Sequence, residues 1–109
     1  MKKIYLASPY SHIAEAKRQE RFCQACIVAA DLIYQGFLVF SPICHTHPIA
    51  QASNLPLDWN YWKALDESFL SWCDELWVLK LEGWEESKGV TAEISFAKNL
   101  NKPISYLEY

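Results

Sequence analysis

The chain has 109 residues, of which 51% are hydrophobic, and its formal net charge at pH 7 is −3. No stretch approaches the roughly 20 consecutive apolar residues of a membrane helix, and the N-terminal apolar run ends too soon, at Pro9, for a signal peptide. Since no basic run exceeds Lys17-Arg18, the composition also argues against nucleic-acid binding, and we expect residues 1–109 to form a single domain of a soluble cytoplasmic protein.

The first third of the chain predicts a strand followed by a helix. Residues 3–7 (KIYLA) form an apolar run that ends at Ser8-Pro9, which is typical of a buried strand that enters a loop. From His12 to about Tyr34, apolar residues recur three and four positions apart, and Gly36 supplies a stop signal. We expect the apolar face of this helix to consist of Phe22, Cys26, Ala29 and Ile33.

The remaining elements alternate in the same way. Residues 37–41 (FLVFS) predict a second strand, and residues 42–56, which contain three prolines, are expected to be irregular. Asp58 can cap a helix that runs to about Cys73. There follow a third strand at 75–81, a polar loop at 82–88, a helix from Val90 to Asn101 and a last strand in ISYLEY at 104–109.

Strands that are apolar throughout and separated by helices are typical of a parallel sheet that is covered on both faces. The predicted fold class is therefore α/β, a doubly wound parallel sheet of four to five strands with helices on both faces, flavodoxin- or Rossmann-like. In such sheets ligands bind beyond the carboxyl ends of the strands. The loops after Ala7, Ser41 and Leu81 are therefore the expected ligand-binding loops.

Two acidic residues interrupt apolar helical stripes. Glu93 lies among Val90, Ala97 and Leu100, and Asp66 lies at the centre of a stripe formed by Trp59, Trp62, Phe69 and Cys73. An unpaired buried carboxylate costs on the order of several kcal/mol, so each acid must be paired, hydrogen-bonded or directed into a cavity. We expect both acids to face one cavity. The alternative is that each helix is rotated slightly, which would let its acid reach solvent.

Glu93 also lies near the predicted start of its helix, at about the fourth position. Unpaired backbone N–H groups and the positive end of the helix dipole favour an ionised carboxylate there. The preceding Ser87 and Gly89 supply a hydroxyl and a backbone that an anion can approach closely. This segment is a candidate phosphate site, although many capped helices begin with Ser and Gly.

Further candidates lie in the loops. Ser8 and Ser11 are small donors beyond the first strand and are expected to line the pocket. His45 and His47 follow the second strand, and His45 is a candidate for a contact with base or sugar, with a satisfied loop histidine as the alternative. Trp84 is expected near substrate or near a partner subunit.

Other polar and sulfur-containing residues have simpler explanations. The Cys23-x-x-Cys26 spacing resembles a redox or zinc motif, but both residues fall inside a helix, so buried thiols are expected and no metal is predicted. Lys17, Arg18 and Arg21 are expected on a solvated face. Five tryptophans in a core this small predict a homo-oligomer, at least a dimer.

Taken together, these segments resemble the nucleoside 2-deoxyribosyltransferase superfamily, over most of the chain. The first strand with its tyrosine (KIYLASPY, Tyr5) is similar, as is the acid eight residues before the Asp that opens a strand (Asp66 and Asp74). A short subgroup shares SPYSH and the later GW segment. The clearest match is the order Ser87, Gly89, Glu93, Ala97 and Lys102-Pro103.

The resemblance implies an enzyme that acts on a small-molecule nucleoside or nucleotide without a cofactor. It implies Glu93 as the nucleophile on the anomeric carbon, Asp66 as the supporting acid and Tyr5 as the residue that orients Glu93. The transferases usually carry Asp at the position of Ser87, whereas the superfamily's nucleoside 5′-monophosphate hydrolases carry Ser. Ser87 therefore favours N-glycosidic hydrolysis of a monophosphate. Deoxyribosyl transfer between nucleobases is one alternative. A non-catalytic nucleotide-binding module is another, because YLEY offers no match to the polar C-terminal residue that many members donate across a subunit interface.

Overall fold

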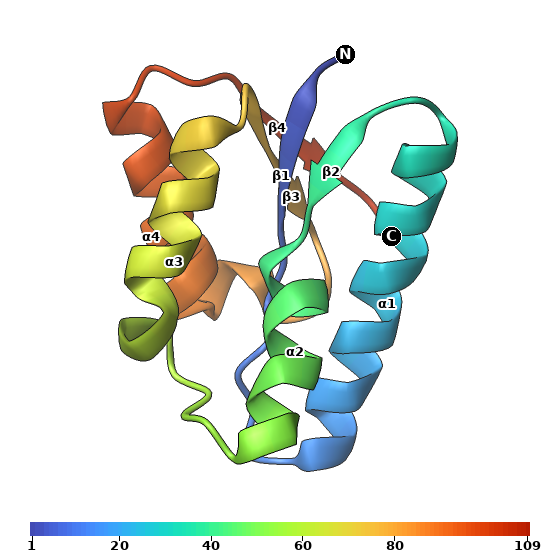
Figure 1. The fold of residues 1–109 in the computed structure, drawn as a ribbon, viewed down its shortest axis with the longest axis vertical. Helices are drawn as coiled ribbons and strands as arrows, with labels where there is room; N and C mark the ends of the chain where they lie inside the picture. Colours follow the sequence, from blue (N-terminus) through green and yellow to red (C-terminus); the bar gives the residue numbers. More distant parts are fainter.

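The computed structural model describes all residues from 1 to 109 (Figure 1). Four strands, four α-helices and one 3₁₀ turn follow one another in the order β1 (Lys3–Ala7), α1 (Glu15–Tyr34), β2 (Leu38–Phe40), α2 (Pro42–Ser53), α3 (Trp59–Trp72), β3 (Glu75–Leu79), η1 (Trp84–Glu86), α4 (Lys88–Asn99) and β4 (Ile104–Leu107). No helix combines the length and the apolar character that crossing a membrane requires.

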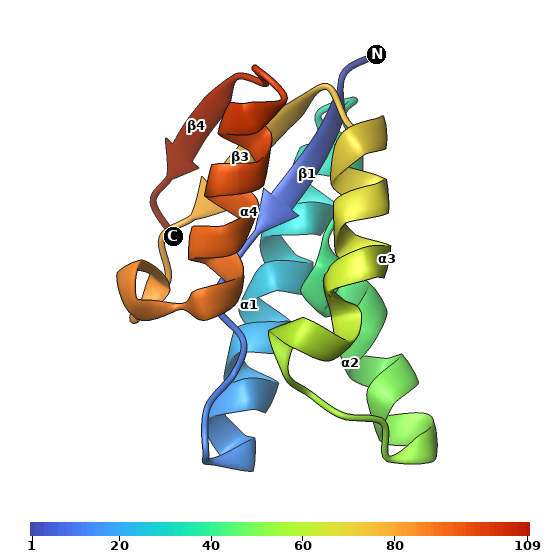
Figure 2. The same ribbon diagram turned by 90° about the vertical axis from the view of Figure 1, so that its left-hand side faces the viewer.

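The four strands form one parallel sheet in the order β2-β1-β3-β4. Helix α1 covers one face of this sheet, and α3 and α4 lie next to each other on the opposite face (Figures 1 and 2). Helix α2 lies beside α1 and extends below the carboxyl ends of the strands (Figure 1). The predicted α/β fold with a parallel sheet and helices on both faces is thereby confirmed.

The alternation of side chains along β1 explains the two layers. Tyr5 and Ala7 point to the face under α3 and α4, where they belong to one buried cluster with residues such as Val78. Leu6 points to the opposite face and packs with Ala29 of α1 in a second cluster. Because both faces are buried, the strand is apolar throughout, which is the pattern that the sequence shows.

Helix α2 corrects the prediction of an irregular stretch at residues 42–56. The Ser41 hydroxyl accepts a hydrogen bond from the Cys44 backbone N–H at 3.2 Å, and Pro42 occupies the first helical position, where its missing N–H has no consequence. Asn54 ends the helix in the left-handed conformation. Only Pro48 lies inside the helix, so two of the three prolines are compatible with a helix over Pro42–Ser53.

The buried face of α1 is shifted by about one residue position from the predicted one, and only Ala29 belongs to both. It consists of Arg21, Ala25, Ala29 and Leu32, whereas Ile33 is 55% exposed and Phe22 and Cys26 are half-buried. The small side chains of Ala25 and Ala29 let the helix approach the sheet, and its larger apolar residues lie at the edge of the contact. Such a shift rotates the whole helix by about 100° and brings Arg21 inside.

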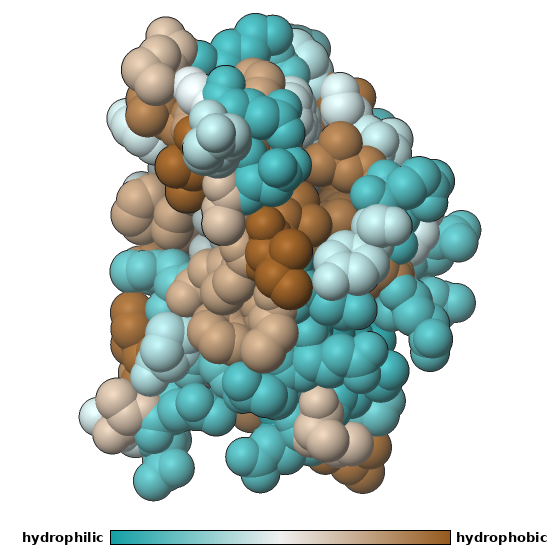
Figure 3. Space-filling view, turned by 90° about the vertical axis from the view of Figure 1, so that its right-hand side faces the viewer, coloured by the Kyte–Doolittle hydropathy of each residue, from teal (hydrophilic) through white to brown (hydrophobic).

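The outer side of α1 is not uniformly polar. Ile27 and Ile33 of α1 and Leu38 of the edge strand β2 are exposed. Figure 3, which views this side of the molecule, shows hydrophobic side chains gathered in the middle of a largely hydrophilic face. The predicted homo-oligomer remains a prediction.

Candidate active site

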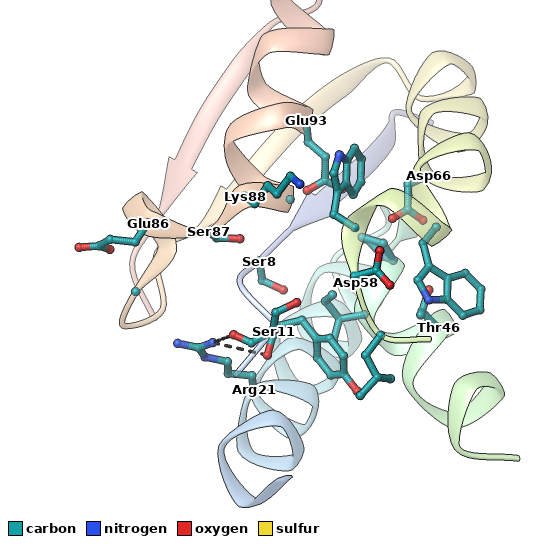
Figure 4. Close-up of a pocket in the computed structure, with 18 of the residues that line it drawn as sticks. Ser8, Ser11, Arg21, Thr46, Asp58, Asp66, Glu86, Ser87, Lys88 and Glu93 are labelled. Atoms are coloured by element: carbon teal, nitrogen blue, oxygen red, sulfur yellow. Dashed lines mark hydrogen bonds between the residues drawn. The ribbon is translucent and has the colours of Figure 1, made fainter. Parts of the chain in front are cut away.

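A cavity of about 660 Å³ lies at the carboxyl edge of the sheet (Figure 4). Its walls come from the loop after β1, Arg21 of α1, the first half of α2, residues 57–66 at the start of α3, and the segment from the end of β3 into α4. The segments after Ala7, Ser41 and Leu81, predicted from the strand ends, all contribute to it, although the one after Ser41 is a helix and not a loop. The polar and aromatic residues that line it include Ser8, Tyr10, Ser11, Arg21, Thr46, Asp58, Trp59, Trp62, Asp66, Glu82, Glu86, Ser87, Lys88 and Glu93.

The two predicted carboxylates, Glu93 of α4 and Asp66 of α3, line this one cavity (Figure 4). Glu93 is 4% exposed and Asp66 is 6% exposed, so neither helix is rotated to bring its acid into solvent. Both helices lie on the same face of the sheet, which is why their inward stripes converge. The expectation that both acids face one cavity is confirmed.

Tyr5 holds Glu93 from the floor of the site. Its side chain is fully buried on β1, and its hydroxyl donates a hydrogen bond to Oε2 of Glu93. Burial, followed by the nearby negative charge of Glu93, raises the pKa of Tyr5 well above its usual value. The phenol therefore remains protonated and acts as a donor toward the carboxylate.

Burial changes the protonation of both acids. It raises the pKa of Glu93 to about 8, with the charge of Asp66 acting in the same direction and the Tyr5 hydrogen bond opposing it. Burial also raises the pKa of Asp66 to about 7. Helix α4 begins at Lys88, so Glu93 is its sixth residue and lies beyond the first turn. The expected position in the first turn of the helix is therefore wrong, and burial is the main influence on the pKa of Glu93.

Three buried polar atoms in the chain have no hydrogen-bond partner, and all three belong to residues that line the cavity. They are Oγ of Ser8, Oγ1 of Thr46 and Oδ1 of Asp66. A buried polar atom without a partner costs on the order of 1 to 3 kcal/mol. Their concentration here indicates a site that is built for polar ligand groups.

The structure places four of the five predicted ligand-binding residues at the cavity. Ser8 and Ser11 lie in the loop after β1, and Ser87 and Gly89 lie at the start of α4. The Ser87 hydroxyl caps α4 by accepting a hydrogen bond from the Val90 N–H at 3.2 Å. The backbone of this turn therefore faces the cavity, as the candidate phosphate site requires.

His45 is the exception and requires a correction. It is exposed and does not line the cavity, because α2 turns it toward the rings of Phe40 and Phe69, with centroid distances of 5.6 and 6.2 Å. Thr46, the next residue on α2, lines the cavity instead. A helix places neighbouring residues about 100° apart, and the prediction of an irregular segment cannot separate His45 from Thr46 in this way.

His47 is buried and acts indirectly through Tyr10. Its Nε2 lies 2.9 Å from Oε1 of Gln19, an acceptor, so this nitrogen carries the proton. Its Nδ1 then accepts a hydrogen bond from the Tyr10 hydroxyl at 2.5 Å. Burial lowers the pKa of His47, which keeps the ring neutral. Tyr10, which lines the cavity, is thereby fixed in position.

Arg21 lines the cavity, whereas a solvated position was predicted for it. It is 8% exposed and donates hydrogen bonds to the backbone carbonyls of Ser11 and Glu82, each at 2.9 Å. These bonds join the loop after β1 to the loop after β3 (Figure 4 shows the contact with Ser11). No sequence pattern indicated this position. In the structure Gly83 leaves room for Arg21, because its φ is +87° and a Cβ there would lie 2.8 Å from Nη2 of Arg21.

The tryptophans that line the cavity are not the one predicted to lie near substrate. Trp59 and Trp62 line the cavity. Trp84 does not line it but packs against the core and against Tyr106, at a centroid distance of 5.6 Å. Trp59 and Trp62 belong to the same helical stripe as Asp66, so the stripe that indicated a cavity for Asp66 was a usable signal for them as well.

The thiols and imidazoles do not converge on a metal-binding arrangement. All four cysteines are free, and no group of three or more His, Cys, Asp or Glu side chains is placed to hold a metal ion. Cys23 is exposed, while Cys26 lies against Cys44. The Cys23-x-x-Cys26 spacing therefore does not bring its two sulfur atoms together.

The comparisons with known proteins agree with this geometry. A family model described as a domain of unknown function, DUF1937, matches residues 2–109. The comparison with curated proteins gives no match. Among solved structures, the 2-deoxyribosyltransferase from the psychrotolerant bacterium Bacillus psychrosaccharolyticus is similar, with a TM-score of 0.64 and 25% sequence identity over 97% of this chain and 72% of that chain. The chain therefore belongs to the DUF1937 family and has a nucleoside 2-deoxyribosyltransferase-like fold.

Proposed function

We propose that this protein hydrolyses the N-glycosidic bond of a nucleoside or deoxynucleoside 5′-monophosphate through a glycosyl-Glu93 intermediate. One observation carries the proposal: two buried carboxylates face the same cavity, and one of them is held by a buried tyrosine. Paired carboxylates of this kind serve reactions that pass through an oxocarbenium-like transition state. The similarity to a 2-deoxyribosyltransferase supports the same class of substrate.

In the first step, the Glu93 carboxylate attacks the anomeric carbon, and the bond between this carbon and the base nitrogen breaks. The electron pair of that bond goes to the base. Asp66 donates the proton that the leaving base requires, and a pKa of about 7 lets it hold this proton near neutral pH. Tyr5, through its bond to Oε2, fixes the carboxylate and leaves the other oxygen free for the attack.

In the second step, water attacks the anomeric carbon and the bond to Glu93 breaks. Asp66, now ionised, accepts the proton of the water, so that both acids return to their initial states. Neutral Glu93 cannot act as a nucleophile, so the active form of the enzyme has Glu93 ionised and Asp66 protonated. The positive charge that develops at the anomeric carbon as the glycosidic bond breaks stabilises ionised Glu93 in the transition state.

The phosphate is assigned to the side of the cavity formed by the start of α4. Ser87, Lys88 and Gly89 line the cavity there, and the N-terminus of a twelve-residue helix presents its unpaired N–H groups. Ser87 and Thr46 lie on opposite sides of the cavity, with Ser8 between them (Figure 4). A nucleotide with its phosphate at Ser87 would thus direct its base toward α2 and α3.

The test of this function is the release of free base from a panel of nucleosides and their 5′-monophosphates, followed by chromatography. We expect release from at least one monophosphate and slower release from the matching nucleoside. Tight binding of a monophosphate without release would instead establish a binding module. The absence of both binding and release across the panel would contradict the proposal.

A Ser87→Asp substitution should weaken monophosphate binding roughly tenfold to a hundredfold, because one like charge beside a phosphate costs about 1 to 3 kcal/mol. Aspartate is also a good helix cap, so the start of α4 should persist. Ser87→Asn is the matched control, since it caps the helix without adding charge. Calorimetry should show little change for uncharged nucleosides; equal losses for nucleosides and monophosphates would remove the phosphate from this turn.

Deoxyribosyl transfer between nucleobases is a second candidate, which the similarity to a transferase favours. The first step is the same, and a second base replaces water in attacking the glycosyl-Glu93 intermediate. Adding an excess of a different free base to the assay separates the two reactions. A transferase forms the new nucleoside or nucleotide, whereas a hydrolase forms only free sugar phosphate and base.

A further inference from the structure

The thiols of Cys26 and Cys44 lie against each other. Cys26 is on α1 and Cys44 is on α2, and their Sγ atoms are 3.1 Å apart. Both residues are half-buried. The other two cysteines are elsewhere: Cys23 is exposed, and Cys73 is buried in the cluster on the opposite face of the sheet.

We propose that Cys26 and Cys44 form a reversible disulfide that joins α1 to α2 and makes the wall of the cavity sensitive to thiol oxidants. The sulfur atoms need to move about 1 Å closer to reach a disulfide bond length of roughly 2.05 Å. The two residues belong to different helices that pack against each other. The inference is independent of the reaction proposed above.

The burial of the Cys44 thiol decides which sulfur atom is proposed to react first. Burial raises the pKa of Cys44 to about 12, so Cys44 remains a thiol near neutral pH and does not react first. With glutathione disulfide as the oxidant, the Cys26 thiolate attacks one sulfur and releases one glutathione thiol. Cys44 then attacks the Cys26 sulfur as its proton leaves and releases the second glutathione. Two protein thiols are thereby oxidised and one glutathione disulfide is reduced to two thiols.

The position of the pair connects it to the cavity. Cys44 is the third residue of α2 and its backbone N–H binds the Ser41 cap. Ile43, directly before Cys44, and Thr46, two residues after it, both line the cavity. A bond between Cys44 and α1 therefore holds the first turn of α2, and this turn forms part of the cavity wall.

The experiment is incubation of the full chain with glutathione disulfide, followed by intact mass and peptide mapping under non-reducing conditions. We expect the loss of two hydrogen atoms, a Cys26–Cys44 peptide, its reversal by dithiothreitol and an increase in Tm of roughly 5 to 15 °C. The variant Cys23→Ser with Cys73→Ala should still form the bond, and Cys26→Ser and Cys44→Ser should each abolish it.

Three results would overturn the inference. In the first, all four thiols remain unmodified after incubation. In the second, the disulfide involves Cys23 or Cys73. In the third, Cys26 carries a glutathione adduct that Cys44 does not displace. Because wild type provides the peptide map, the result does not depend on the folding of any variant.

Discussion

Replacing Glu93 with glutamine is expected to lower the rate of base release by at least about a thousandfold, while binding of the nucleotide stays within about threefold. Glutamine has nearly the same shape and can still accept the hydrogen bond from Tyr5. It cannot form the bond to the anomeric carbon and cannot offset the positive charge that develops there. The loss should therefore appear in kcat and not in the dissociation constant.

Base release measured by chromatography and binding measured by calorimetry provide the two readouts. Glu85→Gln is the matched control, since Glu85 is exposed and does not line the cavity, and it should behave as wild type. Mass spectrometry of a quenched reaction should detect the glycosyl adduct on the wild-type peptide that contains Glu93. Full activity of Glu93→Gln would refute the assignment of the nucleophile while leaving the fold and the cavity unaffected.

The same substitution is expected to stabilise the folded protein at alkaline pH by about 3 to 5 kcal/mol. In the folded state the pKa of Glu93 is about 8, and its ordinary value is 4.5. Between these values the folded state holds a proton that the unfolded state has lost, so the free energy of unfolding falls as pH rises. The stability is complete below about pH 4.5, is lost progressively, and reaches its lower level above about pH 8. Glutamine has no proton to lose and avoids this penalty.

Thermal or urea unfolding at pH 5, 7 and 9 checks the sign. Wild type should lose stability across the series, and Glu93→Gln should lose less, with the largest difference at pH 9. A residual decline is expected in the variant because burial also raises the pKa of Asp66 to about 7. Glu85→Gln should follow wild type. Parallel curves for wild type and Glu93→Gln would show that Glu93 ionises as readily in the folded state as in the unfolded state.

In this site the proposed function of Glu93 and the stability of the fold are opposed. The carboxylate that is required for attack on the sugar is also the one whose ionisation destabilises the unliganded fold. The partnerless oxygen atoms of Ser8, Thr46 and Asp66 add to this cost. A ligand that supplies hydrogen bonds to these atoms stabilises the site, so bound nucleotide should raise the Tm of wild type.

The sequence by itself determined the fold class and the two central acids. Strands such as KIYLA are apolar on both faces, which only a covered parallel sheet explains, and the structure contains that sheet. Glu93 and Asp66 could be found because a carboxylate within an apolar helical stripe violates a local periodic pattern. The cost of burying a charge is large enough to make such a violation informative.

Tertiary structure alone decided the remaining walls of the cavity and the protonation of its acids. Arg21 is buried because α1 packs through Ala25 and Ala29, a rotation that the alternation of residues does not specify. Cys44 meets Cys26, and Thr46 meets the cavity, only because Ser41 and Pro42 start a helix where prolines suggested a loop. The raised pKa of Glu93 depends on how much protein surrounds it, and this desolvation is a property of the whole packed fold and not of neighbouring residues in the chain.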